Sequence, residues 1–368
     1  MTLILGFETS CDETAAAVVE DGRIVRSNVV STQHELHQRF GGVVPEIASR
    51  AHLEKLLPVV KASLKDAGVT LQQLDAIAVG NRPGLVGSLV VGTSAAKALA
   101  WSLGLPLIGV DHVLAHLYAP VLIDGEAVDE ETDATPQATL AYPAIGLVVS
   151  GGHTSLYRVN GPGDVTLLGK TIDDAVGEAY DKAAVMLKAG YPGGPKLDAL
   201  AQRGDGTAHK LPRPLLGPQS LDFSFSGLKT ALLYATRGTP VGRGSASRFE
   251  RSADDLTDQQ RADLAASFQF AVVDTIATKI KRAQKQLVAD GCTPQSLIIG
   301  GGVSANSLLR ERLAYLAEKL DLRLHIPAMA MCVDNAAMIA GLAHERFITQ
   351  DFDDLSLPVV ATTSADQG

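Results

Sequence analysis

Several features that mark common classes of protein are scarce in this sequence. Its three cysteines, Cys11, Cys292 and Cys332, are odd in number and widely spaced, which rules out a disulfide framework and favours a reducing compartment. No stretch is apolar over the ~18 residues that a membrane span requires. The N-terminal residues also lack the basic start of a signal or transit peptide. We therefore expect a cytoplasmic protein without a membrane segment.

An excess of positive charge is missing as well. Acidic residues outnumber basic ones by 41 to 32, which gives a formal net charge of −9. Bulk electrostatics would not hold a nucleic acid to such a chain, so any contact of that kind must come from a local basic patch or from partner proteins. What the chain does have is 368 residues, 46% of them hydrophobic, which suffices for two lobes with large cores.

Apolar runs and amphipathic segments alternate in the same order in both halves of the chain. In the first half the pattern predicts three strands, then helix, strand, helix and strand, at 3–9, 15–21, 24–30, 44–67, 74–80, 87–104 and 105–110. In the second half it predicts three strands, two helices, then strand, helix, strand and helix, at 144–152, 154–160, 164–171, 174–189, 260–290, 296–302, 305–320, 322–326 and 335–347. This repetition predicts an α/β fold of two similar lobes that face a cleft.

Two segments depart from the repeated pattern. Residues 123–138 carry acidic side chains and no basic one, which is typical of a solvated linker. Residues 237–252 carry four arginines among glycines and serines, which indicates either a flexible surface loop or a mobile basic arm that touches phosphates. We place the first lobe at 1–122, the linker at 123–140, the second lobe with helical insertions at 141–348 and a tail at 349–368.

Three glycine-rich turns follow predicted strands. They read GFETSCDET, VVSGGHTSLY and GGGVSANSLLR. Glycine lets the backbone approach a phosphate closely, free N–H and hydroxyl groups supply donors, and the third turn adds a helix N-terminus. Each turn alone is also typical of an ordinary connection, but together they predict nucleotide binding. The P-loop motif is absent and GGGVSA does not open the first βα unit, so neither a P-loop protein nor a Rossmann dehydrogenase is expected.

The stretch VDHVLAHLYA places two histidines in an apolar run. Asp111 is a good N-cap for a helix that starts at His112. His112 and His116 are then one turn apart on the same face, close enough to bind one ion. The alternative, that both are hydrogen-bonded core residues, stays open at this point.

A third ligand is available at Asp334, in MAMCVDNAAMIA. This residue lies at a strand-to-helix junction, where a carboxylate is also a common N-cap. Two imidazoles and one carboxylate form a facial set that suits Fe²⁺ or Zn²⁺ with open positions for substrate. In HVLAH, Val113 stands where a zinc peptidase has the glutamate that activates water, so a peptidase of that type fits poorly.

Ten segments of the chain, in order, resemble those of the bacterial tRNA adenosine threonylcarbamoyltransferase family, the TsaD type, once labelled O-sialoglycoprotein endopeptidase. The resemblance runs from about residue 3 to residue 347, nearly the whole chain, through GFETSCDET, GGVVPEIASRAH, RPGLVGSLVVG, HVLAH, VVSGGHTSLY, DDAVGEAYDKAA, YPGGPKLDALA, DFSFSGLKTAL, GGGVSANSLLR and CVDNAAMIA. It implies the actin-like (ASKHA, RNase H-like) superfold, with two pseudo-repeated lobes around a nucleotide cleft.

The resemblance also implies the reaction. A threonylcarbamoyl group, carried as threonylcarbamoyl-AMP, passes to N6 of adenosine 37 in tRNAs that read codons beginning with A. The implied cofactors are one divalent metal, with Fe²⁺ favoured over Zn²⁺, and an adenine nucleotide such as ATP or ADP with Mg²⁺. The implied partners are tRNA, an inactive paralogue of similar fold (TsaB type) and a small P-loop ATPase (TsaE type); the chain itself forms a homodimer or a heterodimer.

Carried over residue by residue, the resemblance assigns roles to three groups of positions. The metal ligands are His112, His116 and Asp334. The first phosphate turn holds Thr9, Ser10 and Glu13. The nucleotide end of the donor contacts residues of the second lobe, namely Val148, Val149, Ser150, Gly151, Gly152, Asp181, Gly194, Asp198 and Asn306.

One departure from the family's pattern concerns the metal. Archaeal relatives place a tyrosine ligand where this chain has Val148, so substrate or water must complete the metal's shell and its identity stays open. For the tRNA face the best local candidates are Lys210, Arg213, Lys229 and the arginine-rich segment at 237–252, each of which has ordinary surface charge as its alternative.

Three other functions compete with the transferase. A metallopeptidase requires the missing glutamate. A small-molecule kinase of the same superfold would leave HVLAH unexplained. A non-catalytic paralogue should have lost its histidines, and here they are intact.

Overall fold

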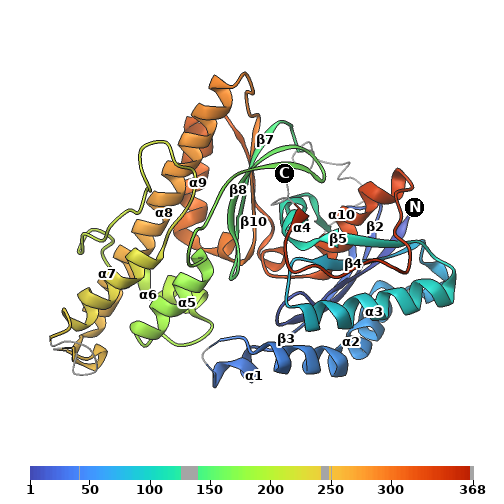
Figure 1. The fold of residues 1–368 in the computed structure, drawn as a ribbon, viewed down its shortest axis with the longest axis horizontal. Coiled ribbons are helices and arrows are strands. Elements are labelled where there is room, and N and C mark those ends of the chain that lie inside the picture. The colour runs from blue at the N-terminus through green and yellow to red at the C-terminus, as the bar shows by residue number, and fades with distance from the viewer. Residues whose placement is uncertain (41, 126–139, 242–247, 250, 365–368) are drawn as a thin grey trace.

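Two mixed β-sheets form the centre of the molecule. The computed structural model describes residues 1–40, 42–125, 140–241, 248–249 and 251–364 (Figure 1). The first sheet has the strand order β5-β4-β1-β2-β3-β6. Its strands are β1 (Leu3–Glu8), β2 (Glu13–Glu20), β3 (Ile24–Thr32), β4 (Ala76–Arg82), β5 (Leu107–Asp111) and β6 (Ile123–Asp124). The second sheet has the order β11-β10-β7-β8-β9. Its strands are β7 (Ala144–Val149), β8 (Thr154–Gly161), β9 (Asp164–Lys170), β10 (Ser296–Gly300) and β11 (Arg323–His325).

The two sheets repeat one topology. In each, the first three strands of the lobe pair antiparallel, and the next two add in parallel beside the first strand. Thus β1 to β5 correspond in order to β7 to β11. The predicted duplication and the actin-like fold class are confirmed by this arrangement.

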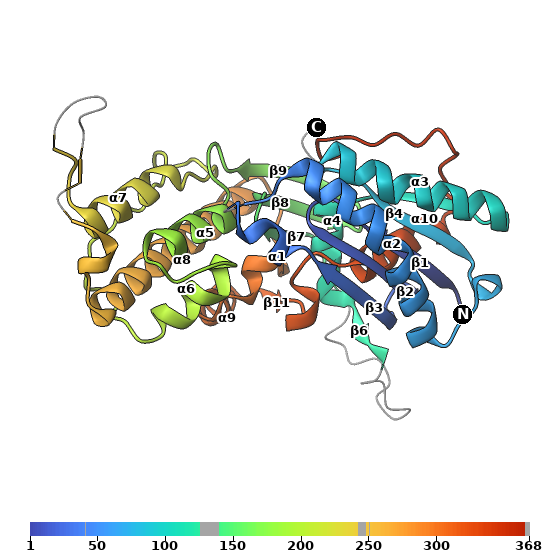
Figure 2. The same ribbon diagram turned by 90° about the horizontal axis from the view of Figure 1, so that it is seen from below.

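Helices cover the outer faces of both sheets. Below the first sheet, α2 and α3 pack through Leu56, Val59 and Ala96, whereas α5 to α9 gather at the far end of the second lobe (Figure 2). The helices are α1 (His34–Gln38), α2 (Pro45–Ala67), α3 (Val86–Leu103), α4 (His112–Tyr118), α5 (Val176–Met186), α6 (Gly193–Ala201), α7 (Ser226–Arg237), α8 (Asp258–Ala289), α9 (Ser307–Lys319) and α10 (Ala336–Ile348).

Two topologically equivalent helices cross between the lobes. Helix α4 follows β5, the last strand of the first repeat, yet its Val113 and Leu117 pack against the second sheet. Helix α10 follows β11, yet it packs on the first sheet and also contacts α4. Glycines permit the close approach on both sides: a Cβ on Gly6 of β1 would lie 2.6 Å from the Ala336 carbonyl oxygen, and one on Gly300 of β10 would lie 2.1 Å from that of His116. The N-termini of α4 and α10 therefore meet between the sheets.

The segments predicted from periodicity are all found, with small differences at their ends. The pattern missed α1, α6, α7 and the two-residue strand β6. Helix α10 lies within the second lobe as we divided the chain, although it packs on the first sheet; the division at 123–140, most of which lies outside the described residues, stays a prediction. Among the described residues, helix α3 is long and apolar enough to cross a membrane by length and composition alone, which for a single helix is weak evidence; one face of it packs on β4 and α2.

Candidate metal centre

Helix α4 is fixed at its first residue. The Asp111 carboxylate ends β5 and accepts hydrogen bonds from Val113 N (2.9 Å) and Leu114 N (3.3 Å) through Oδ1, as an N-cap does. His112 and His116 then lie one turn apart, with ring centroids separated by 4.7 Å. Both imidazoles are buried. The predicted helix start and the shared face of the two histidines are therefore present.

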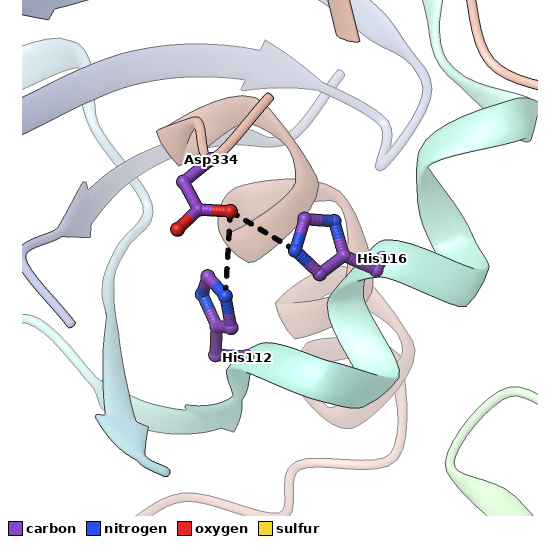
Figure 3. A group of neighbouring side chains, drawn as sticks. All are labelled: His112, His116 and Asp334. Atoms are coloured by element: carbon purple, nitrogen blue, oxygen red, sulfur yellow. Dashed lines mark ion pairs between the residues drawn. The ribbon is translucent and has the colours of Figure 1, made fainter. Parts of the chain in front are cut away.

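Asp334 reaches the same point from the loop before α10. One carboxylate oxygen, Oδ1, lies 3.1 Å from His116 Nε2 and 3.5 Å from His112 Nε2 (Figure 3). One donor atom from each of the three residues lies within 4.8 Å of the others. The structure thus brings together three side chains that the sequence separates widely. Since two imidazoles and a carboxylate are a common ligand set, this cluster is a candidate metal centre.

Glu8 orients the first imidazole from behind. Its Oε2 lies 2.9 Å from His112 Nδ1, and Ser10 Oγ lies 3.3 Å from the same nitrogen. A proton on Nδ1 is therefore held by Glu8, which leaves Nε2 directed at Asp334. Carboxylates in this position fix the tautomer of metal-binding histidines. Burial alone would lower the pKa of His112, but the charges of Glu8 and Asp334 raise it to about 10.

His116 is the second imidazole that faces Asp334, and it is the more deeply buried of the two. Burial lowers the pKa of His116, so this fully buried ring is neutral, and neither ring nitrogen has a hydrogen bond of good geometry among the described residues. Yet Nε2 faces a carboxylate that, despite its burial, the neighbouring imidazoles keep ionised by lowering the pKa of Asp334. A buried imidazole and an ionised carboxylate that face each other at 3.1 Å, with the second imidazole beside them, are a donor set that a divalent metal fits.

The loop that carries Asp334 is held by two side chains. Arg310 donates to Ser304 O (2.7 Å) and Pro327 O (2.7 Å), and its second amino group lies 3.1 Å from Cys332 Sγ. Asn335 caps α10 through Met338 N and donates to Val333 O. Arg310 therefore ties the loop to the third glycine-rich turn.

The first glycine-rich turn lies against this centre. Besides Ser10, which contacts His112, it places Thr9 Oγ1 2.9 Å from Ser88 O, where the hydroxyl donates to α3. Glu13 pairs with His34 Nε2 at 3.5 Å. Burial, opposed by the hydrogen bond from His34 and reinforced by Asp12, raises the pKa of Glu13 to about 8. Asp12, Glu13 and His34 form a second group with donor atoms within 4.8 Å of one another.

In the second turn, the residues assigned to the nucleotide divide into two kinds. Val148 and Val149 are fully buried and contribute their side chains to the cores, so only their backbone is available to a ligand. Gly151 and Gly152 are exposed, with open space where a Cβ would be. Ser150 lies at the junction, where its hydroxyl accepts a hydrogen bond from His153 N. Because Val148 is aliphatic and enclosed, it supplies no ligand to the metal centre.

Asp181 and Gly194 lie together at the start of α6. Asp181 Oδ1 accepts a hydrogen bond from Gly193 N at 2.8 Å, and this carboxylate fills the space where Gly193 would have a Cβ. Burial raises the pKa of Asp181, although the N–H groups of Gly193 and Gly194 oppose that rise. Gly194 itself has open space at its Cβ position.

Asp198 and Asn306 form a second pair, already occupied by hydrogen bonds. Asp198 Oδ1 accepts from Gln269 Nε2, Asn306 Nδ2 and Ser307 Oγ, and its Oδ2 accepts from Ser307 N. Asn306 caps α9 through Leu309 N. Both residues thus have a structural role at the start of α9, and a contact of Asp198 with a ribose stays a prediction.

The basic residues proposed for tRNA are mostly engaged within the chain. Arg213 pairs with Asp274 and lies over the Phe270 ring, and Lys229 pairs with Asp174. Lys210 is exposed. Residues 242–247 and 250 of the arginine-rich segment lie outside the described residues.

Sequence reasoning missed three residues around the centre: Glu8, Arg310 and His153. Glu8 had a signal, because an acid at the end of the apolar strand LILGFE is unusual. His153 follows the second turn; its burial, with the positive charge of His112, lowers its pKa to about 4. Arg310 had no local signal, since its three partners are distant in sequence or are backbone atoms.

The fold and this cluster together define an actin-like, two-lobed α/β protein with a candidate metal centre at the crossing of two helices. Comparison with known proteins agrees with the fold: the chain is similar to full-length HypF, solved in a phosphate- and nucleotide-bound form, with a TM-score of 0.50 and 12% identity over 96% of this chain and 47% of that one. At this identity the likeness concerns the fold alone.

Sequence comparison gives the family. Residues 24–341 match the family model TsaD, tRNA N6-adenosine threonylcarbamoyltransferase. Curated relatives with the same description include one from Trichlorobacter lovleyi, 48% identical over 99% of this chain and 97% of its own length, and one from Symbiobacterium thermophilum, 49% identical over 97% and 95%. The chain belongs to the tRNA N6-adenosine threonylcarbamoyltransferase family, and it is a transferase.

Proposed function

We propose that this chain transfers the threonylcarbamoyl group of threonylcarbamoyl-AMP to N6 of adenosine 37 in tRNAs that read codons beginning with A. The observation that carries the proposal is near-50% identity to such transferases over almost the whole chain, combined with an intact His112–His116–Asp334 cluster. We propose a cytoplasmic location, which the tRNA substrate and the unpaired cysteine usage support.

His112, His116 and Asp334 would hold a divalent metal, with Fe²⁺ favoured and Zn²⁺ as the alternative. When bound, such a metal supplies a Lewis acid for the carbamoyl oxygen or for the phosphate of the leaving group. Glu8 would keep His112 Nε2 directed into the centre by holding the proton on Nδ1.

The remaining residues of the site would bind and orient the substrates. The exposed backbone at Gly151 and Gly152 would offer N–H groups to phosphates, and Gly194, which has open space at its Cβ position, would leave room for the adenine nucleotide or its Mg²⁺ complex. An exocyclic adenine amine is a poor nucleophile, so we expect orientation to supply much of the rate. A base of the anticodon loop can be splayed out of its stack to reach the donor.

No side-chain nucleophile is required, because the acyl donor arrives activated. The thiol in the first turn supports this reading. Burial, with the charges of Asp12 and Asp334, holds the pKa of Cys11 far above its usual range, so Cys11 stays a neutral thiol and a weak nucleophile.

We also propose that partner proteins complete the enzyme: a paralogue of similar fold and a small P-loop ATPase. The adjoining helices α2 and α3 offer a surface for the paralogue, since Leu53 and Leu57 on α2 and Val86 and Val90 on α3 are large, apolar and exposed. Each pair is one turn apart, so each forms a stripe on its helix. An acidic chain that binds tRNA weakly by itself is expected to need such partners.

One assay tests the reaction directly. The chain and its partners are incubated with unmodified tRNA, threonine, bicarbonate, ATP and the synthase that makes threonylcarbamoyl-AMP, and the digested tRNA is examined by mass spectrometry. Threonylcarbamoyl-adenosine should appear with the wild-type chain and be lost with His112→Ala. Full product from His112→Ala would remove the metal centre from the mechanism, and no product from the wild type would overturn the transferase proposal.

A further inference from the structure

The segment after α10, residues 349–364, runs back along the first sheet and ends near α4 (Figure 1). We call it the C-terminal strap. It lies beyond residue 341, where the match to the family model ends, and nothing in the site described above uses it.

The middle of the strap covers β5, which is the edge strand of the first sheet. Asp353 N donates to Leu107 O (2.8 Å), Gly109 N donates to Asp353 Oδ2 (2.7 Å), and Arg346 from α10 donates to Gly109 O. Leu357 packs where a Cβ on Gly109 would be, 2.8 Å away. These contacts pair the outward polar groups of β5 and protect an edge that would otherwise be open.

The end of the strap binds the side chain of Asp111 and not the backbone of β5. Beyond the edge contacts, Thr363 Oγ1 (2.7 Å), Ser364 N (2.7 Å) and Ser364 Oγ (2.8 Å) all donate to Asp111 Oδ2. Thr363 and Asp111 are only 4% and 8% exposed, so the bond between them is shielded from water, whereas Ser364 donates from the exposed side. None of them contributes to covering the edge of β5.

Asp111 therefore has two oxygens with two separate tasks. Oδ1 caps α4, and Oδ2 is held by three donors from the strap. Because the strap holds Oδ2 in place, Oδ1 is also held in place and fixes the position of the Val113 and Leu114 N–H groups. The next residue in the chain is His112, so the strap determines where the first turn of α4 begins and how both imidazoles face Asp334.

We propose that Thr363 and Ser364 are positioning residues: through Asp111 they set the affinity of the His112–His116–Asp334 cluster for a divalent cation. This inference rests on the proposed metal centre. It adds that Thr363 and Ser364, beyond the segment that matches the family model, control it.

The test uses Co²⁺ as the probe, because its visible absorption reports both binding and the geometry of its ligands. Three variants of the full chain are compared with the wild type: Thr363→Val combined with Ser364→Ala, truncation after Val360, and Asp111→Asn. Ser356→Ala is the matched control, since Ser356 lies in the same strap but bonds to Asp354. The thermal midpoint of the metal-free protein is measured for each.

The double variant should bind Co²⁺ about tenfold more weakly than the wild type, with an altered absorption band, because displaced outer-shell groups typically cost ten- to a hundredfold in metal affinity. Its metal-free thermal midpoint should fall somewhat below that of Ser356→Ala, because Asp111 loses two donors; the altered absorption band is the readout that a purely structural role would not produce. Truncation and Asp111→Asn should weaken binding at least as much.

Equal Co²⁺ affinity in the wild type and the double variant would overturn the role of the strap and leave the metal centre standing. A wild-type chain that takes up no Co²⁺ would contradict both proposals. Should the truncated chain fail to fold, the double variant, which keeps the full length of the strap, still decides.

Discussion

The crossing helices α4 and α10 occupy equivalent places in the two repeats, yet they serve the centre differently. Each follows the last strand of its repeat and packs on the sheet of the other repeat. Helix α4 presents two of the proposed ligands, His112 and His116, from within its own turns, and its N-cap is Asp111. Helix α10 presents one ligand, Asp334, from the residue before its cap, Asn335. The site is therefore asymmetric, although the frame that holds it is duplicated.

This difference shows which residues of the centre are held rigidly and which side of the centre is open to solvent. The imidazoles on α4 are buried to 5% and 0% exposure, whereas the Asp334 side chain is 20% exposed. A helix fixes the spacing of two ligands by its backbone, while a residue on a loop before a helix leaves the open side of the centre towards solvent and substrate. The duplicated fold forms the frame, and the three residues of the cluster come from the starts of α4 and α10, where the two repeats differ.

Replacing the acid at the start of each helix, Asp334 before α10 and Asp111 before α4, should give the largest difference in Co²⁺ affinity. Asp334→Asn removes a ligand charge and should weaken Co²⁺ binding by more than about 100-fold, beyond what outer-shell changes cost. Asp111→Asn, next to His112 but not a ligand, should cost only about tenfold. Equal losses from the two variants, measured by Co²⁺ titration, would mean that the helix starts are equivalent after all.

Adding a methyl group at the glycine beneath each helix should have the next largest effect. Gly300→Ala would push a Cβ to 2.1 Å from the His116 carbonyl oxygen, and Gly6→Ala to 2.6 Å from that of Ala336. Overpacking of this kind costs about 1–3 kcal/mol of unfolding free energy. Gly300→Ala should also disturb Co²⁺ binding, since it displaces a ligand residue. Urea unfolding checks both, with Gly161→Ala, which has open space, as the control that should stay near wild type.

The two imidazoles on α4 should respond differently to pH. His112, with a pKa raised to about 10, keeps its proton between pH 6 and 8, whereas the pKa of His116 is lowered and its ring is neutral. Metal binding must therefore displace one proton, so the Co²⁺ affinity should rise about tenfold for each unit of pH.

Replacement of Glu8 sharpens this test. Glu8→Gln removes the charge that contributes most to raising the pKa of His112, so the slope of affinity against pH should become shallower. The same titrations at pH 6, 7 and 8 measure it. A slope that Glu8→Gln leaves unchanged would show that His112 is not the group that loses the proton.

Removing the cap of α10 should have the smallest effect. Asn335→Ala leaves Met338 N without its acceptor and should lower the free energy of unfolding by about 1 kcal/mol. Asn335→Asp keeps the acceptor and should recover most of that loss. Destabilisation well above this value would indicate that the bond from Asn335 to Val333 O also holds the Asp334 loop.

Local patterns predicted most of the fold. Alternating and continuous apolar runs located β1 to β5 and β7 to β11, and Asp111 before an amphipathic run located the start of α4. Helix α6 opens with two glycines and a proline, and α7 lies between a polar loop and the arginine-rich segment, so neither has a clear local signature.

What sequence could not reveal depends on distance across the fold. Nothing near α10 indicates that it leaves its own repeat to cover the first sheet, because that choice is made by packing against Gly6 and its neighbours. The pairing of Glu8 with His112 and the hold of Thr363 on Asp111 join residues on separate elements. Residue types and the strand-to-helix junction made Asp334 a candidate for the third ligand, the family likeness supported it, and the structure brings its carboxylate to the histidines.

The return of α10 to the first sheet also orders events during synthesis. As the nascent chain leaves the ribosome, β1 to β5 emerge early, but the side chains that cover one of their faces, from Ala336 to Ala343, emerge almost last. The N-terminal half must therefore wait, with a bare apolar surface, until nearly the whole polypeptide has been made. A prematurely ended product would keep its histidines and lack both their third ligand and the lid on their own lobe, so it would be inert and a ready target for chaperones.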